Sequence, residues 1–132
     1  MNSPATDTSA ILAAVGALGL TLGSNLFVSH LPAIEGLLVC LYDTGGYDAI
    51  DAMDKATVGR PTIQVTIRGA KDGYQAAYAK AQAIDSQLHL KTETTQGGTR
   101  YLAFYRVGDI NSIGHDDNGR PILTINYRID RT

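Results

Sequence analysis

The stretch of residues 61–90 constrains the fold most, because its hydrophobic period changes once along its length. Its first part alternates between apolar and polar side chains and places Ile63, Val65 and Ile67 on one face, which predicts a strand with one buried face. The following residues predict a helix with one apolar stripe. The stripe recurs at steps of three and four and consists of Tyr74, Ala77, Tyr78, Ala81, Ile84 and Leu88. We expect this helix to lie on the buried face of the strand, with both tyrosines in the core.

Length and charge limit the classes of protein that this chain can belong to. Its 132 residues suffice for one hydrophobic core, so we expect a single domain over residues 1–132, with residues 1–6 as a flexible arm. A net charge of −2 gives no basic footprint for sequence-specific nucleic-acid binding and no polybasic membrane patch. The single cysteine, Cys40, lies in an apolar run and is expected to be a buried thiol.

Residues 9–28 contain no charged side chain, which raises the alternative of a membrane segment. Gly19 and Gly23 even have the spacing of packed membrane helices. The run lacks a preceding lysine or arginine, however, and contains several glycine and hydroxyl residues. Its apolar residues have a one-sided helical spacing: Ile11, Leu12, Val15, Leu18 and Leu22. We therefore favour an amphipathic helix that begins at Thr8 or Ser9 and ends at Gly23.

Three further strands are expected, within residues 32–43, 101–107 and 121–129. The first contains an unbroken apolar run, which is typical of a strand covered on both faces. Two long polar connections, residues 44–60 and 108–120, separate the strands. The resulting order α-β-β-α-β-β predicts an α+β fold with a four-stranded mixed sheet and two helices packed on one face.

The two long connections have a predicted position as well as a predicted length. The first two strands are expected to be antiparallel, and the central helix crosses over to a third strand that runs parallel to the second. Under that topology the connections lie at opposite ends of the sheet. Because long connections in compact domains usually have a purpose, we expect each end to contact a different partner.

The chain lacks the common motifs of catalysis and of metal or cofactor binding. It has no phosphate-binding loop, dinucleotide fingerprint or serine elbow, and its three histidines lack a metal-binding spacing. The segment from Asp109 to Arg120 begins like a calcium loop but ends in arginine instead of a bidentate glutamate. Asp48, Asp51 and Asp54 at steps of three would form a solvated face of a short helix. We expect no enzyme, no metal and no cofactor.

Several segments in order resemble the phage minor capsid family whose members act as tail terminators of long-tailed phages. The resemblance covers the chain from about residue 34 to the C-terminus, whereas the acidic insert at residues 48–55 departs from the family pattern. The matching segments are Tyr42-Asp43-Thr44-Gly45-Gly46-Tyr47, Pro61-Thr62-Ile63-Gln64-Val65 with Arg68-Gly69, the helix with Tyr74, Ala77 and Tyr78, residues 98–101, and Ile113-Gly114-His115-Asp116-Asp117-Asn118-Gly119-Arg120-Pro121.

The resemblance implies a structural protein of the virion, made in the host cytoplasm and placed in the tail or neck. It would form a ring, expected to be a hexamer, that caps the tail tube and ends its polymerisation. Its partners would be copies of itself, the tail tube protein and a head-completion or stopper protein, with DNA passing through the lumen without specific binding, and with no membrane partner. The implied contact residues are Asp43, Thr44, Gly45, Gly46, Asp48, Arg68, His115, Asp116, Asp117, Asn118 and Arg120.

Two alternatives stay open at this point. The chain could be another neck component, such as a head-tail stopper or connector. It could also be a small nucleic-acid-binding domain, because arginines gather in the C-terminal third beside Tyr101 and Tyr105: Arg100, Arg106, Arg120, Arg128 and Arg131.

Overall fold

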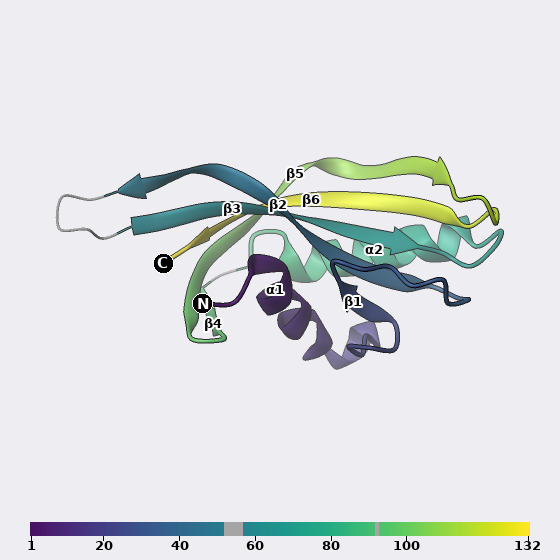
Figure 1. Cartoon of the computed structure of the whole chain (residues 1–132), viewed down its shortest axis with the longest axis horizontal. Helices are drawn as coiled ribbons and strands as arrows, with labels where there is room; N and C mark the ends of the chain where they lie inside the picture. The colour runs from purple at the N-terminus through teal and green to yellow at the C-terminus, as the bar shows by residue number, and fades with distance from the viewer. Residues whose placement is uncertain (52–56, 92) are drawn as a thin grey trace.

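A computed structural model describes residues 1–51, 57–91 and 93–132. Its centre is a six-stranded sheet with the strand order β1-β2-β3-β6-β5-β4 (Figure 1). The strands are β1 (Leu26–Val28), β2 (Leu38–Asp51), β3 (Thr57–Arg68), β4 (Thr94–Gln96), β5 (Thr99–His115) and β6 (Pro121–Arg131). The helices are α1 (Pro4–Ala13), the short 3-10 helix η1 (Gly16–Leu18) and α2 (Tyr74–Leu88). Both α-helices lie on the same face of the sheet, which we call the inner face; the opposite face is the open face.

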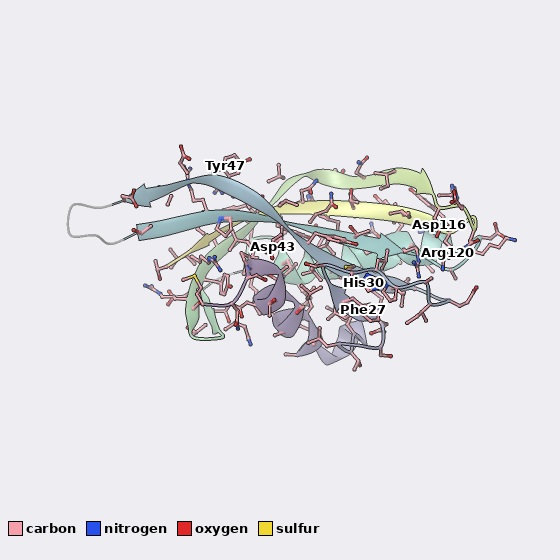
Figure 2. The ribbon with its side chains drawn as sticks, viewed as in Figure 1. Phe27, His30, Asp43, Tyr47, Asp116 and Arg120 are labelled. Atoms are coloured by element: carbon pink, nitrogen blue, oxygen red, sulfur yellow. The ribbon has the colours of Figure 1, made fainter. Side chains whose placement is uncertain are left out.

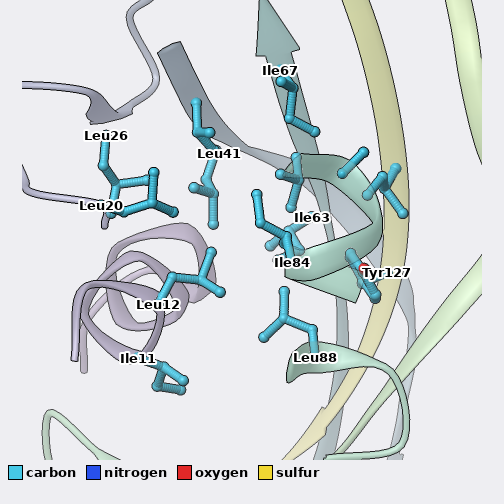
Figure 3. Close-up of a cluster of buried hydrophobic side chains, with 14 of the residues drawn as sticks. Ile11, Leu12, Leu20, Leu26, Leu41, Ile63, Ile67, Ile84, Leu88 and Tyr127 are labelled. Atoms are coloured by element: carbon cyan, nitrogen blue, oxygen red, sulfur yellow. The ribbon is translucent and has the colours of Figure 1, made fainter. Parts of the chain in front are cut away.

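The strand and helix predicted from the change in hydrophobic period are confirmed. Alternate residues of β3 have no exposed surface, and α2 buries one stripe against them. Figure 3 shows Ile84 and Leu88 of α2 beside Ile63 and Tyr127 of the sheet. The fully buried residues of this contact are Ile63, Val65, Ile67, Ala77, Ala81, Ile84, Leu88, Leu123, Ile125, Tyr127 and Ile129. Burial of each large side chain among them contributes about 1.5–3 kcal/mol, so this contact forms the core.

The expectation of core tyrosines is wrong for one of the two. Tyr74 is 42% exposed at the beginning of α2, whereas Tyr78 is half-buried against the core. Their rings lie 6.2 Å apart along the helix. Ala77 and Ala81, rather than the tyrosines, are the completely buried residues in the first half of this stripe.

The predicted four-stranded sheet is wrong, although the α+β class holds. Two strands of three residues each extend the sheet at its edges. β1 pairs in parallel with residues 39–41 of β2, and β4 pairs antiparallel with residues 99–101 of β5. Neither segment has a periodic pattern long enough to be predicted as a strand. The complete sheet is mixed and curves into a half-barrel around the helices.

The two long connections are also not loops. β2 continues to Asp51 and β3 begins at Thr57, so most of residues 44–60 form a β-hairpin. β5 continues to His115, so that a short turn replaces the second connection. Asp48 and Asp51 therefore lie on a strand instead of a helix, and Asp54 lies outside the described residues.

The predicted separation of the two connections is confirmed. β3 and β5 each pair antiparallel with β6 and therefore run in the same direction. Figure 1 shows the β2–β3 hairpin beyond one end of the sheet and the β5–β6 turn at the other.

The first helix begins and ends earlier than predicted. The side chain of Ser3 caps α1 by accepting a hydrogen bond from the backbone N–H of Thr6, and Ala5 is completely buried. Residues 4–6 of the expected arm therefore belong to the helix, and residues 1–3 do not. A left-handed Gly19 ends η1, which interrupts the predicted helix before Gly23.

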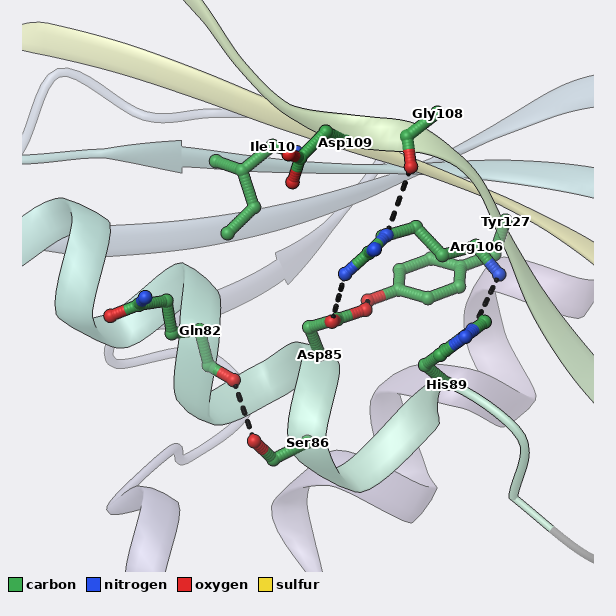
Figure 4. A network of polar contacts seen from close by, with 9 residues as sticks. All are labelled: Gln82, Asp85, Ser86, His89, Arg106, Gly108, Asp109, Ile110 and Tyr127. Carbon is green, nitrogen blue, oxygen red and sulfur yellow. Dashed lines mark hydrogen bonds and ion pairs between the residues drawn. The ribbon is translucent and has the colours of Figure 1, made fainter.

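A partly buried polar network attaches α2 to β5 and β6 (Figure 4). Asp85 of α2 accepts a hydrogen bond from the hydroxyl of Tyr127 at 2.8 Å and pairs with Arg106 at 2.5 Å. His89 Nδ1 accepts from the backbone N–H of Arg106 at 3.0 Å. Burial, followed by the bond to Asp85, raises the pKa of Tyr127, so the phenol remains the donor. These directional bonds fix the position of α2, which apolar packing alone leaves free to slide.

Val65→Asp tests the inner face of the sheet. The substitution places an unpaired carboxylate at a position without exposed surface, and the cost exceeds what a domain with about 5–15 kcal/mol of stability tolerates. We expect an unfolded or aggregated chain by circular dichroism. Asn126→Asp, on the exposed open face, is the control and should remain folded. A cooperatively folded Val65→Asp variant would show that the inner face is assigned wrongly.

Candidate functional site: the two ends of the sheet

The β5–β6 end of the sheet is braced by a cluster that we call the arginine cluster: Arg68, Asp116 and Arg120. Arg120 Nε donates to Asp116 Oδ2 at 2.7 Å, and Arg68 Nη2 donates to the backbone carbonyl of Ile34 at 2.6 Å. Arg120 Nη1 reaches the same carbonyl at 3.5 Å. Both guanidinium groups therefore attach the segment before β2 to the end of the sheet.

The arginine cluster lies largely inside the protein. Arg68 is 5% exposed and Arg120 is 7% exposed. Burial and the neighbouring charge of Arg120 lower the pKa of Arg68, and among the described residues its Nε has no hydrogen-bond partner. The backbone N–H of Arg120 is the main cause of the lowered pKa of Asp116. These residues stabilise the fold of this end of the sheet. Their charges in the sequence did not indicate that role.

Other predicted contact residues of this end face solvent. His115, Asp117 and Asn118 are exposed, and the turn is closed by the bond from Gly119 N–H to the Asp116 carbonyl at 3.0 Å. Gly119 adopts a positive φ of 73°, which agrees with the predicted turn. The structure thus separates an exposed rim from an internal brace.

The other end of the sheet carries a surface that we call the projecting hairpin: residues 43–51 of β2 and 57–62 of β3. In Figure 2 Tyr47 lies on this hairpin, at the opposite end from Asp116 and Arg120. Residues 43–51 are all exposed, whereas residues 38–41 of the same strand are buried. The change along one strand marks the point where the helices stop covering the sheet.

Predicted contact residues at the base of the projecting hairpin have different local roles. Asp43 Oδ1 accepts from the backbone N–H of Ala5 at 2.9 Å and so stabilises the N-terminus of α1. The Thr44 and Thr62 hydroxyls lie 2.7 Å apart across the two strands. A side chain at Gly46 would lie 2.5 Å from the Arg60 carbonyl oxygen, so glycine is required where β2 bulges against β3. Gly45 has open space around it and a positive φ of 87°.

Three residues of the projecting hairpin were not predicted as contacts. Tyr47 is 53% exposed and Ile50 is 56% exposed. Arg60 lies over the Tyr47 ring at 5.9 Å and donates through Nε to the Asp48 carbonyl at 2.6 Å. Strand alternation alone would place Tyr47 and Ile50 on opposite faces, because they are three residues apart. Only the bulge between them brings both side chains to one face.

The described residues offer little for binding of a small ligand. They contain no group of three or more histidine, cysteine or acidic side chains that could hold a metal ion. A cavity of about 290 Å³ beside the hairpin base is lined by Met1, Thr57, Gly59, Arg131 and Thr132, and its volume is at the lower limit of small-molecule sites. Within the described part of the chain, no helix is long and apolar enough to cross a membrane.

Residues 14–132 match the sequence profile of a family described as bacteriophage tail terminator protein. No curated protein sequence is detectably similar to the chain. A solved structure described as the virion of a native gene transfer agent particle contains a chain with 19% identity and a TM-score of 0.63, covering 92% of this chain and 84% of that one. A second solved chain has 15% identity and a TM-score of 0.62, covering 96% of this chain and 89% of that one. At these identities the two structures show a shared fold.

Asp116→Asn tests the arginine cluster through pH. The substitution removes the charge that the cluster stabilises, and Asp117→Asn at the exposed neighbour is the control. Because the folded-state pKa of Asp116 is lowered, its charge stabilises the native state above the unfolded-state pKa, and this stabilisation is lost as pH falls through the folded-state pKa. In urea titrations we expect Asp116→Asn to be less stable than wild type at neutral pH. The difference should shrink as pH falls below the ordinary aspartate pKa of 3.8. A difference that does not depend on pH would contradict this role.

Proposed function

This chain belongs to the bacteriophage tail terminator family, and on that premise we propose that it caps the tail tube as a ring, ends polymerisation of the tube protein and joins the tail to the head or neck. The protein is a structural component of the phage tail. Its partners are further copies of the chain, the tube protein and a head-completion or stopper protein. It is made in the host cytoplasm, acts in the virion and performs no catalysis.

The observation that carries the proposal is the difference between the two ends of the sheet. One end presents the projecting hairpin, and the other presents a polar turn held by the arginine cluster, next to the exposed Ile113 of β5 (Figure 2). A ring that joins a tube to a head needs two unlike surfaces on opposite sides. It also needs lateral contacts of the head-to-tail kind, which can close into a ring, hexameric in this proposal. The exposed residues Asp48, Asp117 and Asn118 are candidates for these contacts.

A second virion function, as a head-tail stopper or connector, uses the same two-ended shape. The family match favours the tail terminator. A stopper binds heads that carry a portal, whereas a terminator binds the ends of tubes.

The contacts of the arginines in the C-terminal third argue against a nucleic-acid-binding domain. Arg100 pairs with Glu93, Arg106 with Asp85 and Arg120 with Asp116. Arg128 lies over the Tyr105 ring at 4.4 Å, and Arg131 donates to the Asn2 carbonyl at 3.2 Å. Each of these arginines therefore has a partner within the same chain. Together with the net charge of −2, this supports a lumen through which DNA passes without specific binding.

Electron microscopy of tail tubes tests the proposed function. Tubes are incubated with the purified chain, then supplied with fresh tube protein, and compared with tubes that received no chain. We expect a ring at one tube end and no further elongation from that end. Elongation at the control rate would contradict the terminator function, and binding to portal-bearing heads instead of tubes would favour the stopper.

A further inference from the structure

We infer that the projecting hairpin of one protomer packs its apolar face on the distal half of β5, residues 107–115, in the next copy of the chain. This inference rests on the proposed function, because it specifies how the lateral contacts of a ring form. It commits to a second copy as the occupant of both surfaces.

The first support is the distribution of exposed apolar side chains. Among the described strand residues, the large apolar side chains that lie exposed are Tyr47 and Ile50 on β2 and Val107 and Ile113 on β5. Tyr47 and Ile50 are 53% and 56% exposed, and Val107 and Ile113 are 44% and 58% exposed. Isolated exposed apolar residues need no explanation, but two pairs confined to two strand segments do.

The second support is the direction of these side chains. Tyr47 pairs with Arg60, and Ile50 with Val58, and cross-strand partners lie on the same face. Even-numbered residues of β3 point away from the face that contains the buried Ile63 and Val65. Val58, Arg60 and their partners on β2 therefore point to the open face. Tyr47, Ile50 and Val58 therefore form one continuous apolar strip on the projecting hairpin, flanked by Arg60.

The two segments cannot meet within one chain. The projecting hairpin extends past one end of the sheet, whereas residues 107–115 lie in the half of the sheet toward the other end (Figure 1), and β2 and β5 lie on opposite sides of the strand order. A contact between them requires two copies placed head to tail. Such a heterologous contact uses a different surface on each copy and closes into a ring when the rotation between copies permits it.

Contact through the faces is favoured over addition of strand edges. Beyond β1 and β4, the outer edges of β2 and β5 have no neighbouring strand among the described residues. Both strands, however, shift register at bulges: β2 between Asp43 and Ile50, and β5 between Val107 and Gly114. Bulges twist an edge away from regular pairing, so the apolar faces are the surfaces left for association.

The size of the projecting hairpin suits this role. From Asp43 to Asp51 a strand spans about 30 Å, and two paired strands are about 10 Å wide. Its apolar face alone would bury roughly 300 Å², somewhat over a third of the about 800 Å² that each partner contributes to a stable interface, so this contact forms one part of the lateral interface.

Complementation between two variants tests the inference. Ile50→Asp removes the hairpin surface, Ile113→Asp removes the receiving surface, and Leu90→Asp is the matched control because Leu90 is 62% exposed on the segment after α2. Circular dichroism verifies that all three fold, and native mass spectrometry measures assembly across the soluble concentration range. We expect wild type and Leu90→Asp to assemble. Each of the other two variants should need at least about tenfold higher protein concentration to reach the same assembled fraction.

The mixture gives the decisive result. In an equimolar mixture, the intact hairpin of Ile113→Asp can still bind the intact receiving surface of Ile50→Asp. We expect heterodimers and no rings. Unimpaired assembly of either variant, a mixture that stays monomeric, or a wild-type chain that never self-associates would each overturn the inference. If the Ile50→Asp variant assembled normally and capped tubes, the hairpin contact would be refuted, but the proposed function would stand.

Discussion

The apolar contact between α2 and the inner face of the sheet is the interaction on which the other features depend. It places the fully buried side chains of β3 and β6 against Ile84 and Leu88 (Figure 3). Because both α-helices lie on this face, the open face has to be compatible with water or with a partner (Figure 1). One cross-strand row of this face consists of small or polar residues, Cys40, Thr66, Thr124 and Asn111, of which the first three are nevertheless buried. The direction of the core thus determines which surfaces remain for assembly.

Buried polar bonds give this core a single arrangement. Asp7 of α1 accepts a hydrogen bond from the Tyr101 hydroxyl, and burial together with this bond raises the pKa of Tyr101 to about 12. Asp85 holds Tyr127 in the same way on the other helix. Lys80 donates to the Leu18 carbonyl at 2.6 Å and so connects α2 to η1. Most of the buried polar groups that sequence reading would consider as functional therefore serve the fold.

The parts of the fold that could be predicted are those whose pattern is local and continuous. Residues 61–68, 74–88 and 121–129 each show one uninterrupted period, and each lies within an element of the predicted type. The strand extensions were missed because Gly45, Gly46, Gly108 and Gly114 are turn formers, whereas here they occupy positive φ in bulged strands. The arginine cluster joins β3 to the β5–β6 turn and, through the Ile34 carbonyl, to the segment before β2, so no local sequence pattern indicates that Arg68 and Arg120 are buried. Charge in the sequence indicated that these residues matter, but not whether they face a partner or the interior.

The replacement of loops by extended strands has a consequence for assembly. A flexible loop loses conformational entropy when it binds, and this loss weakens the contact that it makes. In the projecting hairpin the backbone bonds between β2 and β3, the Thr44–Thr62 pair and the bond from Arg60 to the Asp48 carbonyl have already ordered the chain. The arginine cluster orders the opposite end in the same way. Both ends are therefore organised before any partner arrives, which is the property expected of a part that must join two rigid structures and has no reaction of its own.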